Sequence, residues 1–142
     1  RNAQMVLTVS SAGADRVTLT VMADAYREED VDGEVRVVLG FHPRIAPIKA
    51  AVLPLTKKDG LPDVADALYH DVKRRFPAFY DDGGAIGRRY RRQDEVGTPW
   101  CFTIDHDTLT DRTVTVRHRD SMQQERIGLD QVVAWVAAKL EG

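Results

Sequence analysis

The sequence of 142 residues contains only one cysteine, Cys101. A single thiol can form neither an internal disulfide nor a zinc site built from several cysteines, so we expect a reducing, cytoplasmic environment. The sequence also lacks any run approaching the roughly 20 apolar residues that a membrane-spanning helix needs. The pattern of a secretory signal, a basic segment followed by an apolar stretch and a cleavage site, is missing as well. We therefore expect no membrane among its partners.

An excess of positive charge is missing too, because 20 Lys and Arg residues face 22 Asp and Glu residues. The net charge of −2 differs from the strongly basic balance of a general nucleic-acid binder. The charge is also uneven, since residues 1–34 hold 3 basic and 7 acidic side chains, which leaves 17 basic and 15 acidic ones for residues 35–142. If the protein binds a polyanion, it must use a local patch.

The composition is that of an ordinary globular protein, with 43% hydrophobic and 30% charged residues. Its length fits one domain with a smaller appendage. The segment 42–47 (HPRIAP) contains two prolines, which interrupt regular structure. We place a domain boundary there, between residues 1–45 and 46–142. The chain begins with Arg1 rather than methionine, so we expect it to be a piece of a longer protein.

The first part of the chain predicts four elements. Residues 4–9 are expected to form a short strand, and the apolar residues of 15–26 recur at helical spacing. The acidic stretch 27–34 is expected to be a loop with a turn at Asp32-Gly33. Residues 34–41 then have the composition of a strand.

The second part alternates between strand and helix patterns. Strands are predicted at 48–55, 78–82, 98–105 and 113–120, helices at 61–76, 85–95 and 129–140, a hairpin or longer antiparallel connection at 106–111, and a short strand or turn at 123–128. Two successive β-α-β crossovers make the first three strands parallel. The predicted fold class is therefore α/β, with a small mixed sheet of about five strands flanked by three helices.

The helix expected over 85–95 is rich in arginine. On a wheel of 100° per residue, one of its faces carries three arginines and a glutamate, namely Arg88, Arg91, Arg92 and Glu95. The opposite face carries Ile86, Tyr90 and Gln93, of which the first two are expected to anchor the helix. Guanidinium groups bind phosphate in a forked geometry and stack on bases, so this face suits a polyanion or an unpaired nucleic-acid strand. The alternative is a solvated face with weak ion pairs.

A second group of cations lies near the end of the strand expected over 113–120. Alternation along the strand places Arg117 and Arg119 on one side, away from Val116. If that side adjoins the arginine-rich helix, the two groups together form a cationic groove.

Three segments resemble the C-terminal part of class II aminoacyl-tRNA synthetases. They are APIKAAVLPL (46–55), YDDGGAIGRRYRRQDEVGTPWCFTID (80–105) and TVTVRHRDSMQQERI (113–127), and the similarity extends over residues 11–140. The run Gln93-Asp94-Glu95-x-Gly97-Thr98-Pro99 is most similar to the glycyl-tRNA synthetases, whereas the histidyl, threonyl and prolyl members match more loosely.

The resemblance implies that residues 46–142 have the anticodon-binding-domain fold of these enzymes and bind the anticodon loop of glycine tRNA. The residues expected to contact tRNA are Arg88, Arg91, Arg92, Gln93, Glu95, Arg117 and Arg119. The full-length enzyme would be a ligase that uses ATP and magnesium to attach glycine to tRNA. It would be a homodimer through its catalytic domain, so this piece alone is expected to be monomeric.

The resemblance also makes residues 1–45 the end of a catalytic domain. The segment SAGADR (11–16) is similar to motif 3 of class II synthetases, and Arg16 occupies the position of an arginine that binds the ATP phosphates. Where the family commonly has Glu-Pro before this motif, the sequence has Val9-Ser10. Motifs 1 and 2 are not in the sequence, so it holds no complete catalytic set. We expect it to be unable to form an aminoacyl-adenylate alone.

Two other functions remain open from the sequence. One is a stand-alone anticodon-binding-like module or accessory subunit without catalytic activity. The other is a flavodoxin-like or receiver-like enzyme, for which only Asp81-Asp82 offers clustered carboxylates. The glycines of Gly83-Gly84-x-x-Gly87 could cradle a phosphate but lack the lysine of a P-loop. The four histidines have no metal-ligand spacing, so we expect no metal site.

Overall fold

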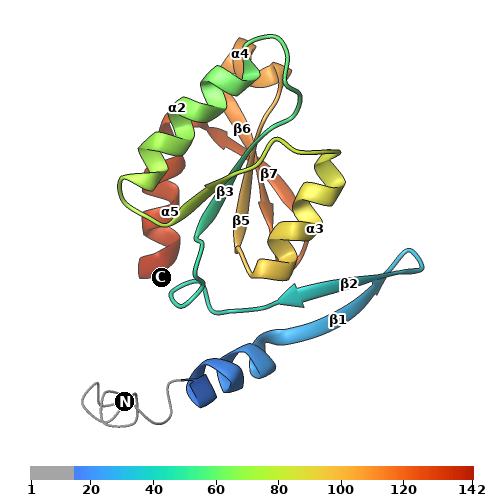
Figure 1. Ribbon diagram of the computed structural model, residues 1–142. Helices are drawn as coiled ribbons and strands as arrows, with labels where there is room; N and C mark the ends of the chain where they lie inside the picture. Colours follow the sequence, from blue (N-terminus) through green and yellow to red (C-terminus); the bar gives the residue numbers. More distant parts are fainter. Residues whose placement is uncertain (1–14) are drawn as a thin grey trace.

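The computed structural model describes residues 15–142, and its main body is a five-stranded mixed sheet covered by helices (Figure 1). The strands are β3 (Ala50–Pro54), β4 (Ala78–Tyr80), β5 (Trp100–Ile104), β6 (Thr113–His118) and β7 (Gln124–Gly128). The helices are α2 (Leu61–Lys73), α3 (Ile86–Val96), α4 (His106–Asp111), the 3-10 turn η1 (Leu129–Gln131) and α5 (Val132–Glu141). The predicted fold class is confirmed.

The strand order is β4-β3-β5-β6-β7. The strand β3 pairs in parallel with both β4 and β5, and β6 and β7 continue the sheet in antiparallel orientation. The crossover through α2 leads outward from β3 to β4, and the crossover through α3 leads back past β3 to β5. Because both crossovers follow the same right-handed rule, the two helices lie on opposite faces of the sheet. The arginine-rich helix therefore covers the face of the sheet opposite α2.

The two faces of the sheet bury very different amounts of apolar surface. The face under α2 and α5 holds the main core, in which Phe102 is fully buried and the ring of Trp135 packs edge-on at 5.8 Å from it. The face under α3 holds a small cluster of Ala51, Leu53 and Cys101, covered by two side chains of α3. Burial of apolar area supplies most of the folding free energy, so the stability of the body comes chiefly from the α2 and α5 side.

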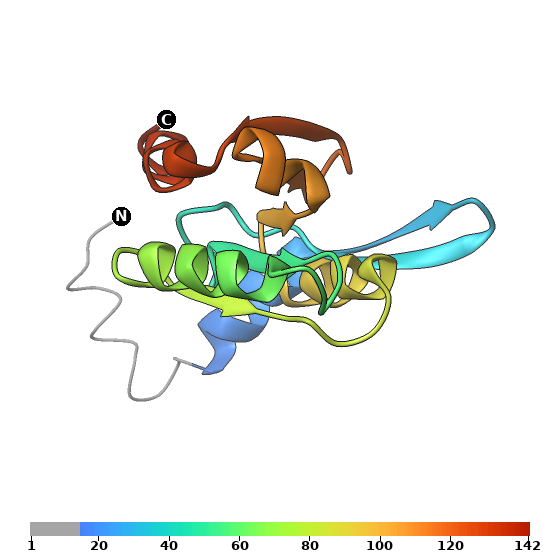
Figure 2. The same cartoon turned by 90° about the horizontal axis from the view of Figure 1, so that it is seen from above.

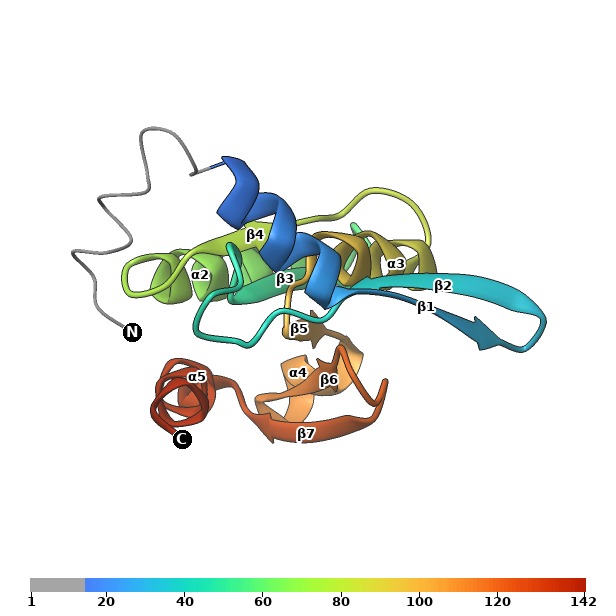
Figure 3. The ribbon, with the colours of Figure 1, turned by 90° about the horizontal axis from the view of Figure 1, so that it is seen from below.

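The remaining elements precede the sheet. A helix over 15–25 leads into the hairpin of β1 (Tyr26–Val31) and β2 (Glu34–Leu39), which projects from the body past α3. Seen from above and from below, the helix over 15–25 lies on the opposite side of the body from α5 and β7 (Figures 2 and 3). None of the helices formed by residues 15–142 has the length and apolar character needed to cross a membrane.

The structure corrects the expectation of an acidic loop over 27–34. Residues 27–31 belong to β1, which pairs along its whole length with β2, and the turn between the two strands forms because Asp32 and Gly33 adopt positive φ angles of 53° and 85°. Such a two-residue turn matches the twist of the flanking strands and fixes a hairpin. The strand expected over 4–9 lies outside the described residues.

The expected connection over 106–111 is also corrected, because it forms the helix α4. Asp105 caps this helix by accepting a hydrogen bond from the Thr108 backbone N–H at 3.2 Å, while the Thr108 hydroxyl accepts one from the Asp105 backbone N–H at 3.1 Å. This capping box satisfies two N–H groups that would otherwise lack partners, which stabilises a single helical turn. Of the short strand or turn expected over 123–128, the structure contains the strand, β7.

Cys101 is the second residue of β5 and is buried there, which raises the pKa of its thiol to about 12. An unfolded cysteine has a pKa of about 8.5, so the folded state holds its proton over a pH range in which the unfolded state loses it. We expect the stability contribution of this group to be present below pH 8.5 and to be lost as the pH rises towards 12.

The same burial predicts that native protein reacts with iodoacetamide at pH 8 at least about 100-fold more slowly than protein unfolded in urea. Mass spectrometry of samples quenched over time measures the rate. Equal rates in the two states would show that β5 opens readily. The Cys101→Ala variant provides the control for the pH dependence, since its unfolding free energy should not decline through this group above pH 8.5.

Candidate nucleic-acid interface

Two glycines set the ends of α3 and one aromatic residue anchors it to the sheet. Gly84 and Gly97 have positive φ angles of 78° and 86°, on either side of the helix, and Gly97 forms its C-cap. The Tyr90 hydroxyl is hydrogen-bonded to the Thr103 hydroxyl of β5 at 2.7 Å. Ile86 packs with Tyr90 on the small apolar cluster. The predicted anchoring face of the helix is confirmed for these two residues.

A buried arginine of α3 holds the loops at the ends of the strands. Arg89 is 2% exposed and donates to the carbonyl oxygens of Pro54, Leu55 and Asp81 at 2.6, 3.1 and 3.1 Å. Desolvation lowers the pKa of its guanidinium. This role was missed in the sequence, although the wheel places Arg89 between the exposed arginines and the anchoring face. That intermediate position was the available signal.

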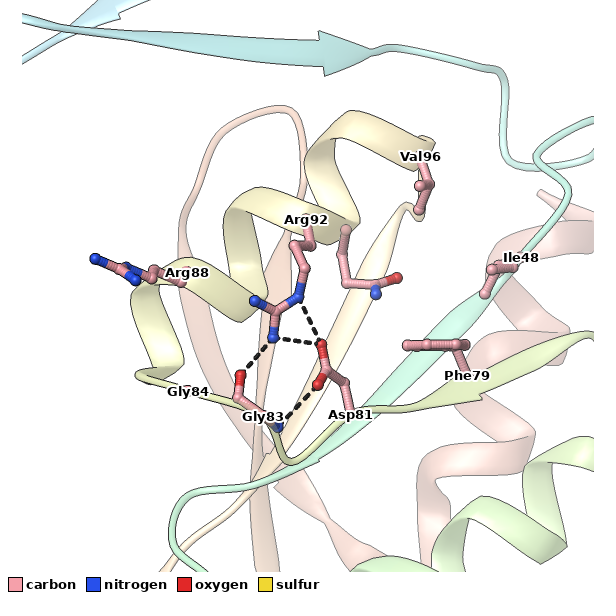
Figure 4. A pocket seen from close by; sticks show the side chains of 9 residues that line it. Ile48, Phe79, Asp81, Gly83, Gly84, Arg88, Arg92 and Val96 are labelled. Atoms are coloured by element: carbon pink, nitrogen blue, oxygen red, sulfur yellow. Dashed lines mark hydrogen bonds and ion pairs between the residues drawn. The ribbon is translucent and has the colours of Figure 1, made fainter.

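A pocket of about 530 Å³ lies between α3 and the edge strand β4 (Figure 4). Its apolar side is formed by Phe79, which is 43% exposed, together with Ile48 and Val96. Its polar side contains Arg88 and Arg92. An accessible aromatic ring beside guanidinium groups is the combination that binds an unstacked base and its phosphates.

Arg92 is held in place at the pocket by the loop after β4. Its Nε and Nη2 donate to Asp81 Oδ2 at 3.0 and 2.8 Å, and Nη2 also donates to the Gly83 carbonyl oxygen. The other Asp81 oxygen accepts from the Gly83 N–H at 2.9 Å. The Arg88 side chain is exposed and points away from Phe79 (Figure 4). Arg92 is thus oriented by an ion pair, and Arg88 extends from the rim.

The expected groove with Arg117 and Arg119 is wrong, because these side chains are 5% and 2% exposed. Arg117 donates to both oxygens of Asp94 at 2.9 and 3.1 Å, and its guanidinium lies 4.7 Å from the centre of the Tyr90 ring. Arg119 donates to the carbonyl oxygen of Gly97 at 2.8 Å. Both arginines adjoin α3, but from its inner side, where a bound strand has no access to them.

The other predicted site residues differ in solvent exposure, from buried to exposed. Gln93 is 3% exposed and lines the pocket, and its amide oxygen accepts a hydrogen bond from the Thr98 hydroxyl at 2.7 Å. Glu95 is exposed and Arg91 is half-buried. Arg16 is exposed on the helix over 15–25, while residues 11–14 of the expected motif 3 and Val9-Ser10 lie outside the described residues.

Residues 15–142 contain no group of three or more His, Cys, Asp or Glu side chains placed to hold a metal ion. Of the pair Asp81-Asp82, the first is engaged by Arg92 as described. The glycine loop Gly83-Gly84 contributes to the lining of the pocket.

The anticodon binding domain family matches residues 49–139 of the chain. Among curated proteins, glycine–tRNA ligase of Caldanaerobacter subterraneus subsp. tengcongensis is 55% identical over 131 residues, which cover 92% of this chain and 28% of that protein. Glycine–tRNA ligase of Thermobifida fusca is 53% identical over 137 residues, or 93% and 30% of the two chains. The chain thus spans less than a third of the length of these relatives.

Solved structures show the same fold at lower sequence identity. A prolyl-tRNA synthetase from Cryptosporidium parvum, complexed with L-proline and AMP, superposes with a TM-score of 0.65 at 20% identity, covering 74% of this chain and 22% of that one. The RNA binding domain of threonyl-tRNA synthetase from Cryptosporidium parvum Iowa II gives a TM-score of 0.59 at 23% identity, covering 66% and 24%.

Proposed function

This chain belongs to the anticodon-binding domain family, and from that membership we propose that it is the tRNA-reading part of a glycine–tRNA ligase. The similarity of about half of its residues to glycine–tRNA ligases, along 92% of the chain, supports the choice of glycine. In the whole ligase, ATP and magnesium would serve the activation of glycine, and two copies would associate through the catalytic part. Residues 15–142 would contribute binding energy and specificity rather than bond-making.

The observation that carries this proposal is the exposed ring of Phe79 beside the cations of α3. Anticodon bases are unstacked, so one of them could stack on Phe79 and be recognised along its edge. Arg88 extends outward from the rim of the same pocket, where it could reach a flanking phosphate. Arg91 and Glu95 lie on the same face of the helix as Arg88, and both are further candidate contacts to RNA. The buried Arg117 and Arg119 are not proposed to touch RNA.

Titration of the anticodon stem-loop of glycine tRNA tests the proposal. We expect Arg88→Ala to weaken binding about tenfold and to reduce the salt dependence by about one ion, because one phosphate contact is lost. Phe79→Ala should cost roughly 1–3 kcal/mol, the usual contribution of one base stacked on an aromatic ring. The exposed Arg74, paired with Asp71 on α2, provides the control, and Arg74→Ala should bind as the wild type does.

A stem-loop with an exchanged anticodon distinguishes base recognition from general attraction to RNA. Phosphate contacts contribute equally to both RNAs, whereas base contacts do not. Equal affinity for the two stem-loops at moderate salt would contradict anticodon reading by this domain. Loss of binding in the Arg74→Ala variant would contradict the location of the site.

A further inference from the structure

A buried cluster of charges joins the hairpin β1–β2 to the helix that bears the proposed RNA contacts. Asp94, near the C-terminal end of α3, is 0% exposed. Arg36 of β2 is also 0% exposed and donates from Nη1 to Asp94 Oδ2 at 2.9 Å. Arg117 of β6 donates from Nη1 and Nη2 to Oδ1 and Oδ2 of the same carboxylate. One carboxylate thus connects three segments that are far apart in the sequence.

The cluster extends to the backbone of the neighbouring turns. Arg36 Nη2 donates to the carbonyl oxygen of Arg119 at 2.6 Å. Arg119 in turn donates to the carbonyl oxygens of Gly97, directly after α3, and of Phe41, in the linker after β2, at 2.8 and 2.7 Å. A shift between the hairpin and the end of α3 would therefore break several buried hydrogen bonds at once.

This kind of contact favours one arrangement more than it adds net stability. A buried ion cluster contributes little over apolar side chains of similar volume, but displacing one partner leaves a charge without compensation. The apolar contact between α3 and the sheet is small, with Ile86 and Tyr90 packed on three short or medium side chains. Apolar packing is also non-directional. Hydrogen bonds of Arg89 and Tyr90 hold the first half of α3, and the setting of its C-terminal half depends on the charges there.

We propose that Arg36 and Asp94 are positioning residues for tRNA recognition. Arg92 lies on α3 two residues before Asp94, so movement of the helix displaces its guanidinium relative to Phe79 on β4. Through Arg36 the hairpin fixes the position of α3 on the sheet. This position keeps Arg92 and Phe79 on opposite sides of the pocket. The hairpin is part of the RNA-reading unit, although none of its residues lines that pocket. The consequence for RNA rests on the proposed function, while the coupling itself does not.

Amide hydrogen exchange of the Arg36→Met variant tests the coupling without RNA. Methionine fills similar space and leaves the pair of Asp94 with Arg117 intact. We expect protection to fall about tenfold or more in the hairpin and in the last two turns of α3, with β3 and β5 unchanged. The control is Arg112→Met, which removes a surface arginine paired with Asp130 and should change protection less than about twofold. If amide protection falls in the hairpin of the variant but stays at the wild-type level in α3, the proposal is overturned.

Affinity for the anticodon stem-loop tests the consequence for recognition. Arg36→Met should weaken binding about fivefold to tenfold at a temperature where melting curves show the variant fully folded. Its effect should be smaller in the Arg92→Ala background than in the wild type, because both changes act on the same pocket. If the double variant loses affinity by the product of the two single fold-changes, Arg36→Met acts through a general structural effect, and the positioning role is overturned. If the wild type binds no RNA, the proposed function fails, and the exchange result still decides the coupling.

Discussion

Asp94→Ala is expected to lower the free energy of unfolding by roughly 3–5 kcal/mol, the range found when one partner of a buried ion cluster is removed. The substitution leaves the guanidinium groups of Arg36 and Arg117 facing each other in the interior, with side chains that are 0% and 6% exposed. Their mutual repulsion and their desolvation are then no longer compensated by the carboxylate that they share. The total stability of a domain is commonly about 5–15 kcal/mol, so this single change removes a large share of it.

Urea denaturation followed by circular dichroism measures this loss as a shift of the midpoint at unchanged slope. The matched control is Asp130→Ala, which breaks a surface pair with Arg112 whose side chains are 77% and 65% exposed. Surface pairs contribute about 0–1 kcal/mol, so the control should remain close to the wild type. Added salt should weaken the surface pair more than the buried cluster. A cost below about 1 kcal/mol for Asp94→Ala would contradict the assignment of a tightly coupled interior cluster.

Gly97→Ala is expected to cost roughly 2–5 kcal/mol, from backbone strain and overpacking together. The φ angle of Gly97 is 86°, a left-handed conformation in which a side chain clashes with its own backbone. A Cβ atom there would also overlap the Phe41 ring and lie 2.8 Å from the Leu39 carbonyl oxygen. The helix end and the linker after β2 would have to separate.

Gly87 provides the matched control for this substitution, because it lies in the same helix with open space around it. Gly87→Ala should raise the stability by roughly 0.5–1 kcal/mol, since alanine restricts the unfolded chain and favours helix. Thermal melting of the two variants should therefore shift in opposite directions. A Gly97→Ala protein that melts with the wild type would show that the close packing against Phe41 is not maintained in solution.

The order of elements between residues 48 and 105 could be predicted because its signals are local. Apolar runs, amphipathic spacing and glycine or proline at the ends identify each element, and the right-handed crossover rule then fixes the parallel strands. Strand β1 was missed because charged residues occupy both of its faces, which hides the alternation of a strand. The short helix α4 has too few apolar residues to show helical periodicity, although its capping box was present in the sequence.

The candidate site could be predicted only for residues whose exposure depends on their position around one helix. The wheel correctly placed Arg88 and Arg92 outside and Tyr90 inside. The sequence could not show what covers Arg117. Its partner Asp94 and the second arginine of the cluster, Arg36, are 58 residues apart in the sequence. Alternation along a strand tells which side a residue takes, but the cover over that side is a property of tertiary packing.

The two borders of the main sheet have a consequence for how the protein behaves at high concentration. One border is β4, which has only three residues, and the other is β7, whose residues Gln124, Glu125 and Arg126 are exposed. Short or charged border strands are poor templates for pairing with a strand of another molecule. Neither border of the main sheet therefore favours stacking of copies through their backbones.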